Sequence, residues 1–407
     1  MTERVCGSTP FDTDEFYRES CDAGYVKIAD MARNIAWTAP TRWGDLQITV
    51  NLSKPEKDPL AIVQAAKSSG DSGGFVDPAT GVVRPCSLCV TDDDVACGYA
   101  RPIAIGGEKW GMWYSPYGYY NEHCIAMSWE HRPMHIDGTA FSCLFDFVDL
   151  FPHYFIGSNA DLPLVGGSIL AHDHFQGGRH AFPMDVAVVD ERFTLAGYPS
   201  LTAGFLRWPL SVIRLSGVDR HEIIDAACSV LDAWKGYDDE DAGIVAQSDG
   251  VRHNTITPIV RKRDGVYEMD LALRCNVTSE EHPLGVFHPH ADLHHIKKEN
   301  IGLIEVMGLA ILPPRLKGEL SRVADALVAH WPYEALAADA LCASHAAWAF
   351  DVASRHPKLD EGNVHAIVRA EVGDVFARVL EDAGVFKWDA SGIAARRRFL
   401  SALSDSL

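Results

Sequence analysis

The sequence lacks the marks of several protein classes. No apolar run approaches the length that crosses a bilayer, and the polar start MTERVCGSTPFDTDE does not resemble a signal peptide. Basic residues are scarce: 36 Lys and Arg stand against 56 Asp and Glu, a formal net charge of −20. This charge argues against nucleic acid and against membranes as partners. We therefore expect a cytoplasmic protein that binds any phosphate-bearing ligand through local cationic side chains.

Low-complexity segments and a dense cysteine framework are also missing. Ten cysteines spread over 407 residues do not form a small disulfide scaffold, and without a signal peptide we expect them to stay reduced. The content of 47% hydrophobic and 23% charged residues is ordinary for a globular protein. A chain of this length can bury a large core, so we expect two or more lobes.

The stretch 166–179, GGSILAHDHFQGGR, concentrates residues that can do chemistry. If a strand runs through it from Ser168, side chains alternate between faces, and Ser168, His172, His174 and Gln176 share one face. The flanking glycine pairs would let the backbone approach a ligand closely. Two imidazoles and a carboxamide would then point into one cavity.

These residue types suit group transfer at phosphorus. When an acceptor holds one nitrogen of a neutral imidazole, the other nitrogen can attack phosphorus and form a covalent phospho-histidine. An amide such as that of Gln176 can donate to phosphoryl oxygens as charge gathers there in the transition state. The alternatives are a pair of structural histidines or a plain metal site.

A CxxC motif, Cys86 to Cys89, precedes this stretch. It could be redox-active, metal-binding or accidental. The residues that follow do not provide the strand-then-helix setting of a redox motif. Tetrahedral zinc needs four ligands, so two more would have to come from elsewhere in the chain.

The hydrophobic pattern predicts elements on both sides of the histidine stretch. Strands are predicted at 46–50, 185–189 and 206–215, and helices at 60–70, 141–151 and 221–234. A hairpin should turn at Asp264-Gly265, and its second strand ends at Arg274. The Arg274 guanidinium could fit phosphate oxygens, with a solvated surface arginine as the alternative.

A second histidine cluster spans 288–295 and is followed by Lys297, Lys298, Glu299 and Asn300. It lacks a glutamine equivalent to Gln176, so we do not interpret it as a second nucleophile. The two lysines can supply positive charge to a phosphate, while Glu299 and Asn300 can bind sugar hydroxyls. A charged helix start is the alternative, because an acidic residue in a first turn suits the helix dipole.

The run from Ser158 to Met184 resembles the UDP-glucose–hexose-1-phosphate uridylyltransferases, also called galactose-1-phosphate uridylyltransferases, and is nearest to their second, bacterial branch. Their broader relatives are the histidine-triad nucleotidyl transferases and hydrolases, whose signature is His-x-His-x-Gln or His-x-His-x-His. The resemblance extends in order to the segments 44–59, 114–128, 253–274 and 294–316. It thus covers most of the chain, although residues 1–30 carry little of the helical extension found in long members of that branch.

The resemblance implies an enzyme that transfers UMP from UDP-glucose to galactose-1-phosphate through a uridylyl-His174 intermediate, with Gln176 beside it. It also implies that zinc, if bound, is held by Cys86, Cys89, His131 and His172. Asn159 would lie near the nucleotide phosphates, and the region 297–300 would recognise the sugar phosphate. No organic cofactor is expected. The alternative functions are a histidine-triad nucleotide phosphorylase or hydrolase, and a non-catalytic protein that binds nucleotide sugars.

We expect an α+β fold with two histidine-triad-like halves, whose antiparallel sheets are flanked by helices, and a helical C-terminal layer. The predicted divisions are an arm at 1–30, a half with the nucleophile at 31–190, a half for sugar-phosphate recognition at 191–317, and helices at 318–407. The sequence leaves the oligomeric state open, a homodimer included.

Overall fold

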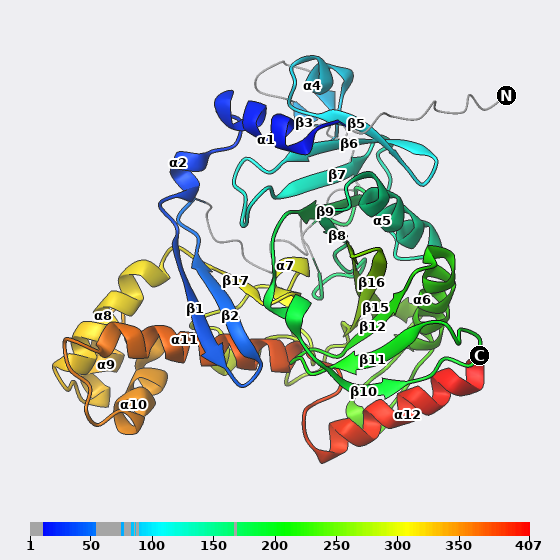
Figure 1. Ribbon diagram of the computed structural model, residues 1–407. Helices are drawn as coiled ribbons and strands as arrows, with labels where there is room; N and C mark the ends of the chain where they lie inside the picture. Colours follow the sequence, from blue (N-terminus) through cyan, green and yellow to red (C-terminus); the bar gives the residue numbers. More distant parts are fainter. Residues whose placement is uncertain (1–10, 54–74, 77–82, 85, 87–88, 167–168) are drawn as a thin grey trace.

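An antiparallel sheet of ten strands organises the molecule (Figure 1). The computed structural model describes residues 11–53, 75–76, 83–84, 86, 89–166 and 169–407. Across the sheet the strands follow the order β10-β11-β12-β16-β15-β8-β9-β7-β6-β5. Their bounds are β5 (Arg101–Ile105), β6 (Glu108–Tyr114), β7 (Cys124–Ser128), β8 (Phe155–Gly157), β9 (His174–Gly178), β10 (Val189–Phe193), β11 (Thr202–Leu206), β12 (Val212–Gly217), β15 (Asn254–Arg263) and β16 (Val266–Cys275).

The sheet consists of two halves with the same connectivity. In each half, three strands are followed along the chain by a long helix and then by two strands. The last of these strands pairs on both sides with strands of its own half. The helices are α5 (Gly138–Leu150) and α6 (Arg220–Lys235). The halves join where β8 pairs with β15, with Gly157 opposite Ile259. The predicted α+β fold with two antiparallel halves is therefore confirmed.

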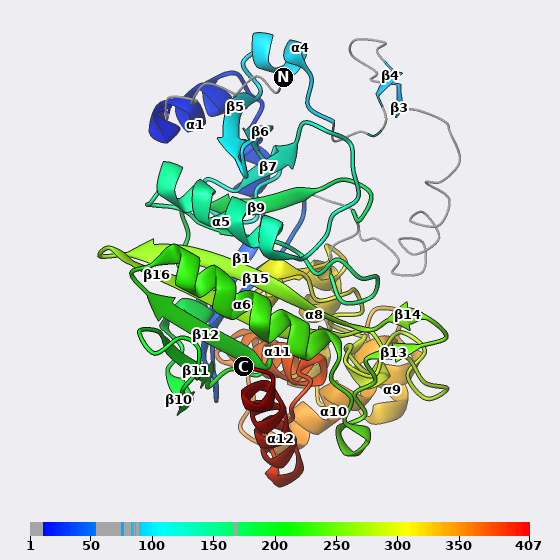
Figure 2. The same cartoon turned by 90° about the vertical axis from the view of Figure 1, so that its right-hand side faces the viewer.

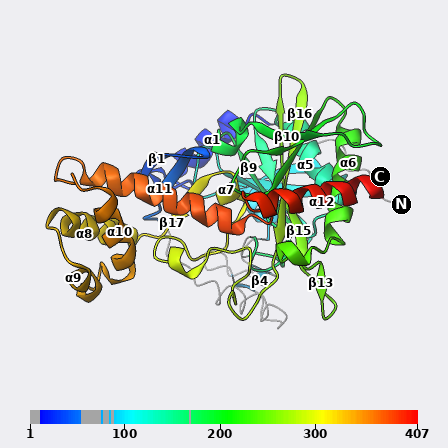
Figure 3. The same ribbon diagram turned by 90° about the horizontal axis from the view of Figure 1, so that it is seen from below.

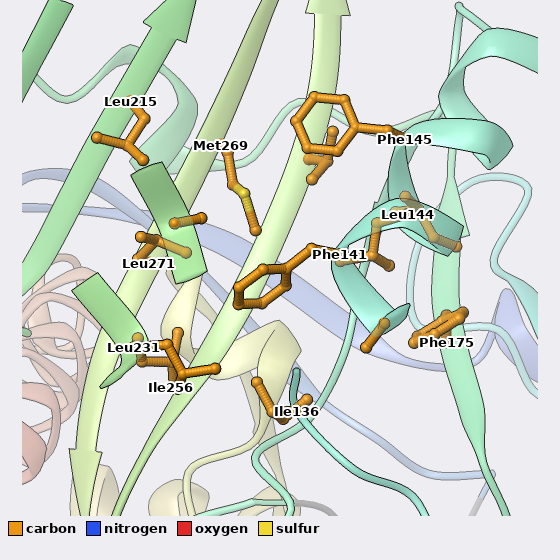
Figure 4. Packing of buried hydrophobic residues seen from close by; sticks show 14 of the residues in the cluster. Ile136, Phe141, Leu144, Phe145, Phe175, Leu215, Leu231, Ile256, Met269 and Leu271 are labelled. Carbon is orange, nitrogen blue, oxygen red and sulfur yellow. The ribbon is translucent and has the colours of Figure 1, made fainter. Parts of the chain in front are cut away.

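Helices α5 and α6 lie side by side over one face of the sheet (Figure 2). Both begin at an aspartate whose side chain accepts backbone N–H groups of the first turn, which satisfies donors that a helix start leaves open. Figure 4 shows Phe141 and Phe145 of α5 directed toward Met269 and Leu271 of the sheet, and Leu144 on the side of Phe175. This core packs against one face of the sheet, and the opposite face is available for the site.

A smaller layer covers part of the opposite face. Strands β1 (Ile35–Thr41), β2 (Gly44–Val50) and β17 (Leu309–Leu312) form a three-stranded sheet in which β17 runs parallel to β2. Leu46, Ile48 and Val50 are buried, as the alternation at 46–50 predicted. Helix α11 (Val364–Ala383) packs on this sheet, and Figure 3 shows α11 followed by α12 (Ala390–Ser406) across the underside of the molecule.

The other described elements are short or lie outside the two sheets. They are α1 (Thr13–Asp22), α2 (Ile28–Met31), β3 (Phe75–Val76), β4 (Val83–Arg84), α4 (Asp92–Ala96), η1 (Pro183–Val186), η2 (Glu240–Ala242), β13 (Gln247–Ser248), β14 (Val251–Arg252), η3 (Ala291–Leu293), α7 (Leu303–Val306), α8 (Leu316–Val328), α9 (Tyr333–Ala338), η4 (Ala343–His345) and α10 (Ala346–Arg355). Among the described residues, no helix combines the length and the apolar character that a membrane span needs.

Several predicted elements are confirmed and some are wrong. The helices at 141–151 and 221–234 correspond to α5 and α6, and the hairpin turns at Asp264 and Gly265, both with positive φ. The predicted strand 206–215 is instead two strands, because the chain turns at the intervening Pro209, which has no N–H to donate. The predicted strand 185–189 is a 3₁₀ turn followed by the start of β10. The predicted arm at 1–30 contains helix α1, which the sequence analysis did not predict and which buries Phe16. The helix predicted at 60–70 lies outside the described residues.

Candidate active site

The strand in the histidine stretch begins at a later residue than the sequence predicted. Strand β9 begins at His174, so residues 169–173 form a loop and His172 is not part of the strand. Alternation holds from His174 onward: Phe175 points into the core and stacks on Trp110 with ring centroids 4.9 Å apart, while His174 and Gln176 share the other face. Ser168 lies outside the described residues, and its predicted binding role stays a prediction.

The His174 imidazole is oriented by its own loop. Its Nδ1 lies 2.8 Å from the carbonyl oxygen of His172 and donates to it, which leaves the Nε2 lone pair free of a proton. The side chain is buried, and burial lowers the pKa of His174, so the ring stays neutral at pH 7. A neutral ring with one nitrogen held by an acceptor is prepared for nucleophilic attack.

Gln176 is held by a histidine that the sequence analysis did not single out. His123 precedes β7, and its Nε2 lies 3.0 Å from the Gln176 Oε1. His123 is buried between the rings of Tyr119 and Tyr120. In the sequence it is one histidine in an aromatic segment without a motif, so no local signal connects it to Gln176.

Gly166, Gly177 and Gly178 serve packing within the protein, whereas the flanking glycines were predicted to admit a ligand; Gly167 lies outside the described residues. A Cβ on Gly177 would lie 2.6 Å from the Phe155 carbonyl oxygen, and one on Gly178 would collide with the Glu122 carbonyl. Gly178 also has a φ of 147°, which side chains disfavour. A Cβ on Gly166 would meet the Ala160 carbonyl oxygen at 2.6 Å. Glycine is therefore required here because neighbouring backbone lies close to β9 and its approach.

Four side chains meet at the loop 169–173, which precedes His174: Cys86, Cys89, His131 and His172. Their ligand atoms all lie within 4.8 Å of one another. The two sulfurs are 3.6 Å apart, and the sulfur–nitrogen distances are 3.2 Å, 3.5 Å and 3.8 Å. Around tetrahedral zinc at its usual bond lengths, two sulfurs are about 3.8 Å apart and a sulfur and a nitrogen about 3.5 Å apart.

This donor set fits a zinc ion. His172 donates from Nε2 to the Ser128 carbonyl at 2.8 Å, so its Nδ1 lone pair faces the sulfurs. Such a carbonyl partner fixes the tautomer of a metal-binding histidine. Zinc here would tie the CxxC loop to the segments before and after α5. Through the His172 carbonyl, it would also steady the ring of His174.

A buried polar group lies near the other end of the site. The Asn159 Oδ1 accepts the Leu303 N–H at 2.8 Å, and the register of β8 with β9, which sets Gly157 opposite Gln176, leads Asn159 toward His174. Arg274 donates from its guanidinium to the Ile301 carbonyl at 2.9 Å. His288 lies 3.3 Å from Asn300 through Nε2 and Oδ1. The segment 300–303 thus brings Asn159, Arg274 and Asn300 together.

The predicted phosphate-binding lysines differ in their surroundings. Lys297 is buried, with its Nζ 3.0 Å from Glu305 and 3.3 Å from Glu299. Burial alone would lower the pKa of Lys297, but the two carboxylates outweigh it and raise this pKa. The charge of Lys297 is therefore balanced inside the protein. Lys298, Glu299 and Asn300 are only partly buried, which leaves Lys298 as the better placed cation.

A neutral, oriented imidazole beside an amide donor is what an enzyme needs to transfer a group at phosphorus. Comparison with known proteins agrees. The family model for the N-terminal domain of galactose-1-phosphate uridyl transferase matches residues 3–133, and the model for its C-terminal domain matches residues 147–350. The chain belongs to the galactose-1-phosphate uridylyltransferase family.

Individual relatives carry the same name. The galactose-1-phosphate uridylyltransferase of Streptococcus salivarius is 48% identical over 395 residues, 95% of this chain and 77% of that protein. The enzyme of Bacillus subtilis is 47% identical over 400 residues, 96% of this chain and 76% of that protein. Among solved structures, yeast Ap4A phosphorylase Apa2 has a TM-score of 0.42 and 12% identity over 79% of this chain and 92% of that chain, a likeness too slight to inform the site.

Proposed function

We propose that the protein transfers UMP from UDP-glucose to galactose-1-phosphate, giving glucose-1-phosphate and UDP-galactose, in two displacements through His174. In the first, the Nε2 of His174 attacks the uridine-bearing phosphorus, and the bond to the glucose-1-phosphate oxygen breaks. In the second, a phosphate oxygen of galactose-1-phosphate attacks the uridylyl-histidine, and the imidazole leaves. Splitting the reaction in this way gives ping-pong kinetics.

The observation that carries this proposal is the hydrogen bond from the His174 Nδ1 to the His172 carbonyl at 2.8 Å. Once Nε2 is bonded to phosphorus, the ring carries a positive charge, and the carbonyl dipole stabilises it through the Nδ1–H. The same contact keeps the ring aimed in both displacements. Alignment of this kind matters because catalysis of phosphoryl transfer is mostly positioning and charge stabilisation.

The remaining residues have proposed roles around these displacements. The amide of Gln176 donates to the phosphoryl oxygens. Asn159 and Arg274 bind phosphate groups, and Lys298, Glu299 and Asn300 bind the hexose phosphate. Zinc on the Cys86, Cys89, His131 and His172 set is structural. The compartment and assembly stay predictions: cytoplasmic, with a homodimer to be tested by light scattering.

Replacement of His174 tests the nucleophile. With UDP-glucose labelled in the uridylyl group, we expect labelled protein from the wild type and none from His174→Asn, with kcat reduced by at least about 10⁴-fold. His221→Asn is the matched control, because His221 is exposed on α6 and the variant should label normally. Labelled His174→Asn protein would place the nucleophile elsewhere. Release of free UMP without galactose-1-phosphate, at the rate of transfer, would instead indicate a hydrolase.

A further inference from the structure

Gln176 can help the reaction only if its amide faces the right way. A carboxamide has an NH₂ end that donates and an oxygen end that accepts. Turned by half a rotation, Gln176 would present its oxygen to the phosphoryl oxygens and repel them. Whatever fixes the amide orientation therefore decides whether Gln176 promotes or opposes transfer.

The two nitrogens of His123 have different partners. The backbone N–H of Tyr119 donates to the His123 Nδ1 at 3.4 Å, so Nδ1 acts as an acceptor. In a neutral imidazole the proton then resides on Nε2. That Nε2 is 3.0 Å from the Gln176 Oε1 and donates to it. The oxygen end of the amide thus faces His123, and the NH₂ end faces away, on the side of the sheet where His174 lies.

The backbone around His123 is held firmly on β9. The Tyr120 hydroxyl donates to the Gly177 carbonyl at 3.1 Å, and Gly178 packs directly against the Glu122 carbonyl. Glu122 has a φ of 53°, in the left-handed region, and its buried carboxylate accepts from the Tyr154 hydroxyl and from Asn121. A non-glycine residue in that region is strained and persists only where its surroundings hold it. The strained turn at Glu122 thus places His123 next to Gln176.

We propose that His123 is a positioning residue for the transfer: it donates from Nε2 to the Gln176 oxygen and so directs the NH₂ of Gln176 at the phosphoryl group. This inference rests on the proposed function, in which Gln176 donates to that group. In this proposal His123 acts on the amide of Gln176 and is given no direct role at the phosphorus. Its effect on rate passes through Gln176 alone.

Two variants of His123 distinguish the effect of its hydrogen bond from the effect of its side-chain size. His123→Leu keeps an apolar side chain of similar size between Tyr119 and Tyr120 but removes the donor, while the amide of His123→Gln can donate in its place. We expect His123→Leu to lower kcat about 10- to 100-fold with the KM for UDP-glucose within twofold, less than the roughly 10²- to 10³-fold that follows removal of a transition-state donor itself. His123→Gln should recover at least a third of the wild-type kcat. His253→Leu, which removes a similar contact between His253 and Asn276, is the control and should stay within twofold.

The decisive measurement is the same His123→Leu substitution in a Gln176→Ala background. If His123 acts through Gln176, the second substitution adds less than a twofold loss, because nothing remains to be positioned. Independent, multiplicative losses would overturn the inference and leave the role of Gln176 intact. So would equal losses for His123→Leu and His123→Gln. A Gln176→Ala enzyme with normal kcat would overturn the proposed role of Gln176 and the inference with it. If His123→Leu does not fold, His123→Gln alone tests the inference. A loss of rate in His123→Gln would then overturn it.

Discussion

Arg274 is more deeply buried than Arg214, Arg261, Lys297 or Arg396, and among the described residues no carboxylate forms a salt bridge with it. Its side chain is 1% exposed, and its hydrogen bonds go to the Ile301 carbonyl and, at 3.5 Å, to the Thr257 hydroxyl. Burial lowers the pKa of Arg274 to about 10, so the group remains charged at pH 7. A buried cation of this kind costs stability. A site that binds an anionic substrate compensates for that cost only when it is filled.

We therefore predict that Arg274→Met separates activity from stability. The kcat/KM should fall about 10- to 100-fold, while the Tm stays the same or rises, because a buried charge is replaced by an apolar chain. Steady-state kinetics and thermal unfolding of the substrate-free protein measure both.

Arg214→Met provides the matched comparison. Arg214 is also buried, but its Nε pairs with Asp270 at 2.6 Å, so its loss should lower the Tm. The cost should stay below the roughly 3–5 kcal/mol of a fully broken buried pair, because Arg261 still contacts Asp270 at 2.7 Å. An Arg274→Met protein with an equally lowered Tm would make Arg274 a structural residue.

The sequence predicts the residues of the site better than their contacts. The His-x-His-x-Gln motif and the CxxC motif identify side chains that the structure brings together, because each motif fixes its residues within a few positions. The sequence analysis did not identify His123, because His123 directly precedes β7 whereas Gln176 lies on β9. The pairing of these two strands is specified only by the folded sheet. The glycines were misinterpreted for a related reason: what lies against Gly177 and Gly178 comes from residues 155 and 122.

At the scale of elements, buried histidines join the helical lobe α8–α10 to the rest of the protein. The Nδ1 atoms of His295 and His345 are 2.8 Å apart, and the His345 Nε2 is 2.9 Å from Glu319 on α8. Arg315 donates to Glu319, and Trp348 of α10 lies against both rings. Burial lowers the pKa of both histidines, that of His295 to about 3.

This pair should make stability depend on pH. The unfolded chain takes up protons near pH 6.5, whereas the buried rings do not, so the unfolded state binds more protons as the pH falls from about 6.5 toward about 3. Stability is therefore complete above pH 7 and falls below it, by at most about 1.4 kcal/mol per pH unit for each group. Denaturant unfolding at pH 7, 6 and 5 measures the slope.

The variant His295→Gln removes one of the two groups and should show a shallower slope over the same range, whatever its stability at pH 7. His330→Gln is the control: His330 is an exposed histidine just beyond α8, and its removal should leave the slope unchanged. A His295→Gln protein with the wild-type slope would contradict the assignment.

Element prediction succeeded where the sequence pattern and the packing agree. Helices α5 and α6 each present one apolar side to one face of one sheet, so periodicity alone locates them. It failed at 206–215, where Trp208 and Leu210 lie in a turn between strands and are buried against the second layer. It also failed at 185–189, where Val186 and Val188 are exposed in spite of their apolar character. Helix α1 was missed although Asp12 and two acidic residues in its first turn signal a helix start.

At the scale of the whole molecule, the Cys/His set connects distant parts of the chain. Cys86, His131 and His172 are separated by 45 and 41 residues in the sequence. A metal that closes such loops removes much of the freedom of the unfolded chain. Its loss should therefore affect stability as well as the loop that orients His174.

We predict about one zinc per chain by metal analysis, and loss of that zinc in the Cys86→Ser, Cys89→Ser double variant, with a lower Tm and a lower kcat. Cys97→Ser is the control, because Cys97 is exposed outside the cluster, and it should keep metal, Tm and kcat. Wild-type protein purified without chelator and free of any metal would contradict the site. A metal-free double variant with normal Tm and kcat would contradict its structural role.

The pairing of β8 with β15, which joins the two halves of the sheet, has a consequence for folding during synthesis on the ribosome. The first half can form once β9 has emerged, but β15 starts 76 residues after β9 ends (178 to 254). Until then β8 is an open sheet edge, and open edges recruit strands of other chains. β8 has three residues and ends at Gly157, too short to offer a foreign strand a long ladder. The shortness of this central strand would protect the nascent chain during that interval, at a place where the finished sheet has no edge at all.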